Sequence, residues 1–275
     1  RANGQAAWPK LPAAVQAIDA AVQSGVDVSF NVYPYTVTLS VLYNYLPSWF
    51  SRGGKTKLLE RIKQPKLRAR VVAEMKQQPF KYGDMIVAQA PINKSLAGKK
   101  IGDLAVASSL SVEETVLNTL VAANGQVIVM DATVNEEHVR QLLVHPRGIV
   151  GTDAAGYDLR YRGELVHPRS FGTFPRVVAK YVRDELLLSL ESAIQKMTAW
   201  PAQRLGMQKR GLVKEGYYAD LVIFDPATIQ DQATTQHPFR FATGIEHVVI
   251  NGKVVHGDFK QGNPMAGQVL RRGQT

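Results

Sequence analysis

Residues 25–33 read Gly25-Val-Asp-Val-Ser-Phe-Asn-Val-Tyr33, a glycine followed by an alternating run that is rich in β-branched side chains. The preceding residues 11–24 place apolar side chains at helical spacing, and Gly25 stands where a left-handed helix stop is expected. Helix, glycine and strand in this order predict one turn of an α/β unit.

Two later segments repeat this pattern. Residues 126–130 follow a predicted helix at 112–123, and residues 148–153 follow a predicted helix at 135–144. Both are short apolar runs of the kind that a parallel sheet buries on both faces, so we expect all three strands to be parallel.

The connection from Tyr33 to Gln126 is far longer than a normal connection, which predicts an inserted subdomain at 43–110. Its expected elements are basic helices around residues 58–75, a strand at 84–88 and a short helix after Gly98.

Beyond Asp153 the sequence predicts a loop, helices at 174–183 and 189–198, and then strands at 219–224 and 245–255 with a hairpin at Asn251-Gly252. We therefore predict an α/β chain with one part at 1–204 and a small β-domain portion at 205–275.

The composition sets outer limits on function. The chain has 275 residues, 45% of them hydrophobic, no cysteine and a formal net charge of +10. The absence of cysteine fits a reducing compartment and predicts a cytoplasmic protein. Basic residues are spread along the chain without aromatic interleaving, which argues against nucleic-acid binding, and no apolar run is long enough to predict a membrane span.

Asp153 is the sharpest candidate for chemistry. It ends a predicted buried strand, the position where barrel enzymes keep catalytic groups, and its carboxylate could bind a metal or act as a base. An aspartate that only caps the next turn would have the same pattern.

Two further motifs flank this position. His167-Pro-Arg169 offers a guanidinium fork that suits a substrate carboxylate, although the same tripeptide recurs at 145–147. Tyr33-Pro-Tyr35 leaves its strand at the same predicted end, where its phenols could bind a ligand or simply pack.

None of the six histidines is spaced as a metal pair, so the spacing predicts no complete metal site within this sequence. Phosphate-binding glycine loops and serine-hydrolase motifs are absent as well, which argues against nucleotide binding and serine hydrolysis.

Seven motifs together resemble the N-acyl-D-amino-acid deacylase (D-aminoacylase) family of the amidohydrolases. They lie at residues 27–35, 151–153, 167–175, 196–206, 210–216, 219–225 and 249–254, and cover nearly the whole chain. The resemblance implies a partial (β/α)₈ TIM-type barrel, of which this chain supplies the last three strands, the inserted subdomain and part of a small β-sandwich domain.

The resemblance also implies roles for individual residues. Asp153 matches the catalytic acid/base and a candidate second-metal ligand, Arg169 matches the arginine that grips the substrate carboxylate, and Tyr33 and His167 fall in the substrate-binding group. The implied cofactor is Zn²⁺, and the implied partner is a small N-acyl amino acid.

The sequence also departs from the family pattern. Its main metal ligands precede the point where this sequence begins, so we expect a further N-terminal segment or a companion chain, and the oligomeric state stays open. Val134 and Leu39 replace an expected Met and Ser, and Thr152-Asp-Ala154 replaces Ser-Asp-Gly.

We expect hydrolysis of N-acyl-D-amino acids to a carboxylate and a D-amino acid. A cyclic-amide hydrolase related to dihydroorotases and hydantoinases, and a non-catalytic fragment that only binds ligand, are the alternatives.

Overall fold

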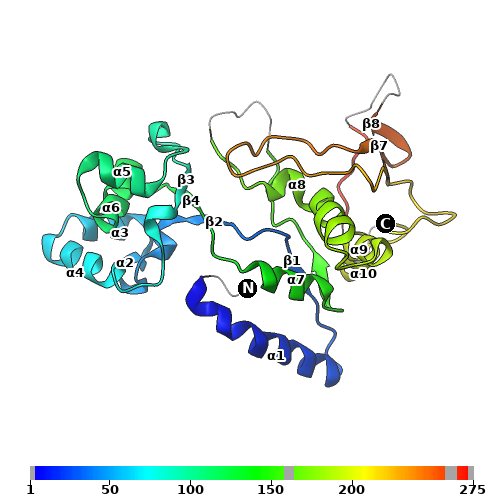
Figure 1. The fold of residues 1–275 in the computed structure, drawn as a ribbon, viewed down its shortest axis with the longest axis horizontal. Coiled ribbons are helices and arrows are strands. Elements are labelled where there is room, and N and C mark those ends of the chain that lie inside the picture. Colours follow the sequence, from blue (N-terminus) through cyan, green and yellow to red (C-terminus); the bar gives the residue numbers. More distant parts are fainter. Residues whose placement is uncertain (1–3, 158–163, 258–264, 272–275) are drawn as a thin grey trace.

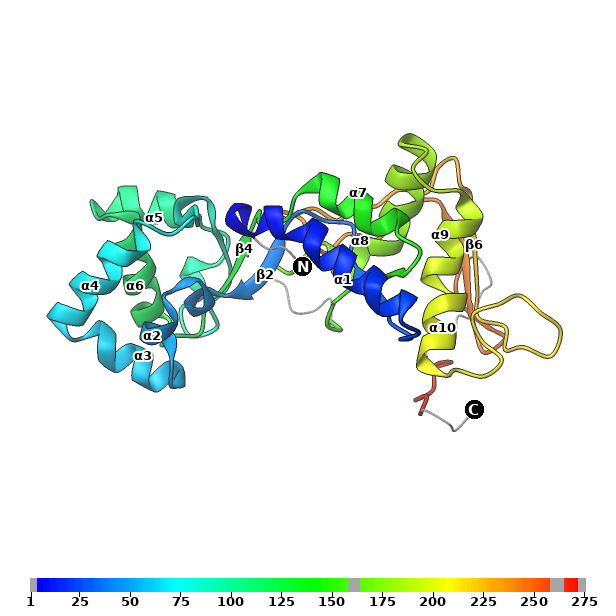
Figure 2. The same cartoon turned by 90° about the horizontal axis from the view of Figure 1, so that it is seen from below.

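The computed structural model describes residues 4–157, 164–257 and 265–271, and it has the mixed α/β fold that the sequence predicts. The molecule is elongated, with the helices of residues 48–122 gathered at one end and the C-terminal sheet at the other (Figures 1 and 2). The N-terminal helix α1 (Leu11–Gln23) lies along the middle, beside α7 (Glu136–Val144).

Strands β1 (Phe30–Val32) and β5 (Gly148–Val150) form a parallel pair at the centre. Helix α1 ends just before Gly25, whose φ of 87° lets the chain reverse into β1 as predicted. Gly148 is required at the start of β5, because a Cβ there would lie 2.4 Å from the Leu142 carbonyl oxygen.

The predicted parallel role of residues 126–130 is wrong. Strand β4 (Ile128–Asp131) is antiparallel to both β2 (Thr38–Val41) and β3 (Ile86–Gln89), in the order β2-β4-β3. An apolar run predicts a buried strand but says nothing about its partner, and here the partner strands come from the long connection itself. The described residues thus contain one parallel pair rather than three adjacent parallel strands.

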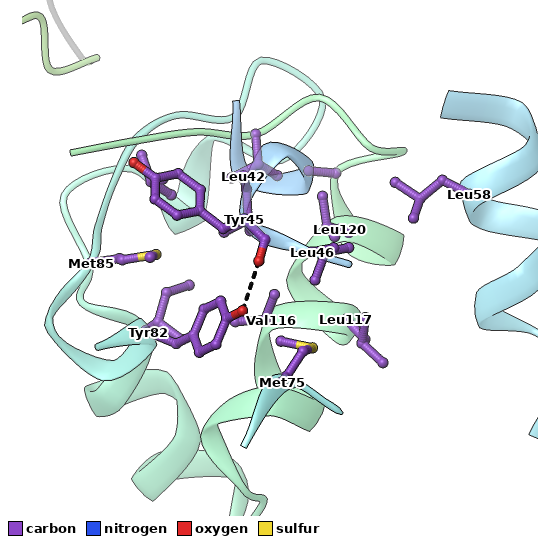
Figure 3. Close-up of a cluster of buried hydrophobic side chains, with 14 of the residues drawn as sticks. Leu42, Tyr45, Leu46, Leu58, Met75, Tyr82, Met85, Val116, Leu117 and Leu120 are labelled. Atoms are coloured by element: carbon purple, nitrogen blue, oxygen red, sulfur yellow. Dashed lines mark hydrogen bonds between the residues drawn. The ribbon is translucent and has the colours of Figure 1, made fainter. Parts of the chain in front are cut away.

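The helical end of the molecule has its own hydrophobic core, which extends from Leu42 to Val129 (Figure 3). The core also holds a buried hydrogen bond, in which the Tyr82 hydroxyl donates to the Tyr45 carbonyl oxygen at 2.7 Å. Its helices are α2 (Ser48–Ser51), α3 (Gly54–Ile62), α4 (Pro65–Met75), α5 (Ile101–Ser108) and α6 (Val112–Ala122), with short 3-10 turns at Leu42–Tyr45, Tyr82–Asp84 and Lys94–Leu96.

A second core cluster joins the parallel pair to α7, to the π-helix η5 (Val177–Asp184) and to α9 (Leu190–Met197). The π-helix continues α8 (Arg169–Arg176), and α10 (Ala199–Leu205) follows α9. The buried members of the cluster are Val32, Val139, Leu143, Val150, Val177, Tyr181 and Ala193. Helix α8 begins at Arg169, five residues before the predicted start at Phe174, so that the His-Pro-Arg motif forms the entry to a helix.

The C-terminal part is a three-stranded antiparallel sheet of β6 (Leu221–Phe224), β7 (Ile245–Ile250) and β8 (Lys253–His256). Asn251 and Gly252 both have positive φ, which confirms the predicted hairpin between β7 and β8. No helix in the described ranges is long and apolar enough to cross a membrane.

Lys196 is an unusual structural element because its side chain is fully buried. Its ammonium group donates to the carbonyl oxygens of His145 at 2.7 Å and Gly148 at 3.0 Å, and it lies over the Trp200 ring. It thereby joins the end of α7 and the start of β5 to α9.

We predict that Lys196→Ala lowers the free energy of unfolding by about 3 kcal/mol, because it removes the ammonium donor from the Gly148 and His145 carbonyl oxygens and opens a cavity. Urea denaturation measures the change, with Lys76→Ala at an exposed position as the control. Equal stability of the two variants would contradict a clamping role for Lys196.

Candidate active site

The carboxyl ends of β1 and β5 meet at one edge of the parallel pair. The Gly151 amide donates to the Val32 carbonyl oxygen at 3.0 Å, so the two strands leave the sheet together and lead to Tyr33 and Asp153. Asp153 has φ of 49°, a conformation that costs energy for a residue other than glycine and is often found at functional sites.

Asp153 and Arg169 face each other across this edge. Arg169 Nη1 lies 3.0 Å from Asp153 Oδ2, and the exposed fractions of the two side chains are 9% and 62%. The buried guanidinium therefore presents its charge toward an accessible carboxylate. Arg169 Nε has no hydrogen-bond partner among the described residues, so one N–H donor of the guanidinium is not used by them.

The Tyr33 ring packs against the Arg169 guanidinium. The Arg169 guanidinium lies 4.7 Å from the centroid of the Tyr33 ring, which is a cation–π contact. The Tyr33 side chain is buried, and its hydroxyl donates to the Val37 carbonyl oxygen at 3.3 Å. In this structure the ring of Tyr33 positions Arg169, while its hydroxyl contacts the backbone.

His167 is also buried and is held at both nitrogens by backbone groups. Its Nδ1 accepts from the Arg169 amide at 3.0 Å, so Nε2 carries the proton and donates to the Val37 carbonyl oxygen at 2.8 Å. The neutral ring thus ties the start of α8 to the segment after β1. This geometry orients Arg169 and leaves neither ring nitrogen directed at a substrate.

The structure therefore brings together all four residues that the sequence singles out. It adds two that sequence reasoning missed, Arg176 and Asp231. They lie behind Tyr35, whose ring packs edge-on against His167 with the ring centroids 5.4 Å apart. Tyr35 and Arg176 have a signal in the sequence, the Tyr-Pro-Tyr motif and a position two helical turns after Arg169. Asp231 has none, because it comes from a distant loop.

Asp131 is a further missed carboxylate. It ends β4 and is paired with Thr38, the residue after Val37, and it is only 8% exposed. Burial raises the pKa of its carboxyl to about 6. Like Asp153, Asp131 stands at the end of an apolar strand, and this pattern could have identified it from the sequence.

The described residues do not form a metal site by themselves. No group of three or more His, Asp or Glu side chains in that part of the chain could hold a metal ion. Asp153 offers a single carboxylate that Arg169 already contacts, and the nitrogens of His167 are bonded to backbone groups.

Comparison with known proteins gives this geometry a context. Residues 153–256 match the model of the "Amidohydrolase family". The chain is 31% identical to the N-acyl-D-glutamate deacylase of Alcaligenes xylosoxydans xylosoxydans over 96% of this chain and 46% of that protein. It is 43% identical to the D-aminoacylase of the same organism, over 50% of this chain and 28% of that protein.

Among solved structures, the N-acyl-D-glutamate deacylase of Bordetella bronchiseptica, complexed with zinc and a phosphonate mimic of the tetrahedral intermediate, superposes with a TM-score of 0.72. That match has 27% identity and covers 95% of this chain and 46% of the other. The chain spans less than half the length of each of these relatives.

The fold and the match over residues 153–256 thus place the chain in the amidohydrolase class. Within that class, the chain belongs to the D-aminoacylase family of N-acyl-D-amino-acid deacylases.

The close packing of Gly172 against Tyr35 leads to a testable prediction. A Cβ on Gly172 would lie 2.5 Å from the Tyr35 hydroxyl oxygen, so Gly172→Ala should lower the free energy of unfolding by about 2 kcal/mol. Tyr35→Phe removes that oxygen, which has no hydrogen-bond partner among the described residues, and should restore part of the loss. Thermal unfolding of the two single variants and the double variant measures the rescue. Gly156→Ala, where the added methyl meets open space, is the control, and additive losses in the double variant would contradict the contact.

The raised pKa of Asp131 leads to a prediction about pH dependence. Burial of the Asp131 carboxyl favours its protonated form, so its pKa is raised in the folded protein. The folded state is therefore most stable below the ordinary pKa of the carboxyl, and this stability is lost as the pH rises through about 6. Between about pH 4 and pH 7 this loss amounts to about 3 kcal/mol in the free energy of unfolding. Asp131→Asn should remove that part of the pH dependence in denaturant titrations, whereas the exposed Asp103→Asn should keep it. An unchanged pH profile in the Asp131 variant would refute the shift.

Proposed function

We propose that this chain supplies the carboxylate-binding and proton-transfer groups of a zinc-dependent deacylase that hydrolyses N-acyl-D-amino acids to a carboxylate and a D-amino acid. The observation that carries the proposal is the buried Arg169 guanidinium facing the accessible Asp153 carboxylate at 3.0 Å. Family membership supports the reaction, because its relatives are named as deacylases of such substrates.

Arg169 is proposed to bind the α-carboxylate of the substrate. A guanidinium fork matches a carboxylate in shape and charge, and the buried position of Arg169 strengthens the attraction relative to water. The Tyr33 ring on one side and the His167 ring bonded to the Arg169 amide fix the direction of the fork. The substrate is then held with its amide near Asp153.

Asp153 is proposed to carry the proton. Its carboxylate takes a proton from the attacking water as the C–O bond forms at the acyl carbonyl carbon, and it returns that proton to the amide nitrogen as the C–N bond breaks. Zinc, when bound, supplies a Lewis acid that polarises the carbonyl and makes water more acidic.

The remaining zinc ligands are proposed to come from polypeptide outside this sequence, either upstream or in a companion chain. We further propose that β1 and β5 belong to a (β/α)₈ barrel, that residues 43–110 are an insertion, and that residues 205–275 are part of a small β-domain. The likeness to the longer deacylase structures supports this arrangement.

The central prediction concerns Asp153→Asn in the holoenzyme. The amide cannot accept and return a proton, so kcat for an N-acyl-D-amino acid should fall by about 10³-fold while the zinc content is unchanged. Turnover of N-acyl-D-amino acids, their L-enantiomers and hydantoins, together with elemental analysis, measures both effects.

The exposed Glu191→Gln variant is the control and should keep full turnover. Retained turnover in the Asp153 variant would end its assignment as the base. Turnover of hydantoins alone in the wild type would favour the cyclic-amide hydrolase, and absence of both zinc and turnover would favour a ligand-binding protein.

A further inference from the structure

Helix α8 carries two arginines on one face. Arg169 and Arg176 are seven residues apart, about two helical turns, so their side chains leave the helix in nearly the same direction. Each lies over one ring of the Tyr33-Pro-Tyr35 turn: Arg169 at 4.7 Å from the Tyr33 centroid and Arg176 at 4.9 Å from the Tyr35 centroid.

Arg176 also bonds to the backbone of that turn. Its Nε donates to the Pro34 carbonyl oxygen at 2.8 Å, and its Nη1 lies 3.1 Å from Asp231 Oδ2. A single guanidinium therefore joins the middle of the tyrosine turn to a carboxylate from the loop that connects β6 to β7.

Asp231 is held firmly in this position. Its side chain is 5% exposed, and Arg183 anchors the preceding segment by donating to the Ile229 carbonyl oxygen at 2.7 Å. A buried carboxylate needs a partner, so Asp231 and Arg176 stabilise each other's burial and neither can turn away at low cost. Arg176 is thus paired with a buried carboxylate, whereas Arg169 is paired with the accessible carboxylate of Asp153.

The two arginines are coupled through His167. The centroid of its ring lies 5.5 Å from that of Tyr33 and 5.4 Å from that of Tyr35. The three aromatic rings therefore form a continuous layer between the two guanidinium groups. A shift of Tyr35 would therefore disturb the ring on which Arg169 rests.

We propose that Asp231 and Arg176 are positioning residues for substrate binding, which fix the Tyr33–Tyr35 turn and through it the direction of Arg169. This inference rests on the proposed function of Arg169. It assigns to a loop of the C-terminal part, far from the site in sequence, control over the affinity for the substrate carboxylate.

The test compares two substrates in the holoenzyme: an N-acyl-D-amino acid and the corresponding carboxamide, which lacks the negative charge. Asp231→Asn should raise KM for the acid by about 10-fold with kcat within about 2-fold, because the grip on the carboxylate is loosened while Asp153 is untouched. KM for the carboxamide should not change. Arg176→Lys, which keeps the charge but loses the bond to Pro34, should show the same split, and thermal unfolding confirms that each variant is folded.

Asp103→Asn is the matched control, since Asp103 is an exposed aspartate on α5, outside the elements that hold the tyrosine turn. Equal KM changes for acid and carboxamide, or a folded Arg176→Lys variant with an unchanged KM for the acid, would overturn the positioning role. A wild-type holoenzyme that neither binds nor hydrolyses the acid would instead refute the proposed function, and the positioning role with it.

Discussion

The parallel pairing of β1 with β5 is the constraint on which the rest of the candidate site depends. Three residue pairs, from Phe30 with Gly148 to Val32 with Val150, set the register, and the bond from Gly151 to Val32 extends it by one step. Because parallel strands end at the same edge, this register places Tyr33 and Asp153 together although about 120 residues separate them in sequence. A shift of one residue would turn each of these side chains to the opposite face.

The features that local chemistry determines could be read from the sequence. Gly25 ends the first helix, Ser189 caps α9 through its hydroxyl, and Asn251-Gly252 forms the hairpin, each because a few adjacent residues settle the backbone conformation. Asp153 and Arg169 could be singled out for the same reason, since each stands next to a recognisable strand end or motif.

Features that depend on distant partners could not be read in this way. The apolar run of β4 suits a parallel strand as well as an antiparallel one, and only the folded chain shows Thr38–Val41 beside it. Asp231 gains its role solely from the approach of a loop after β6 to helix α8. His167 is a similar case, because its two backbone bonds, one of them to Val37, give it an orienting role that its motif does not reveal.

The two ion pairs of α8 differ in a way that explains how one face of a helix can serve both structure and binding. Arg169 pairs with a carboxylate that is 62% exposed, so that carboxylate can be solvated by water when an incoming carboxylate takes its place at the guanidinium. Arg176 pairs with a carboxylate that is 5% exposed, and separating that pair would leave the buried charge of Asp231 without its counter-ion. The exchangeable pair therefore lies where the proposed substrate arrives, and the fixed pair lies behind it. With the tyrosine turn held between them, the guanidinium of Arg169 can exchange partners without losing its orientation.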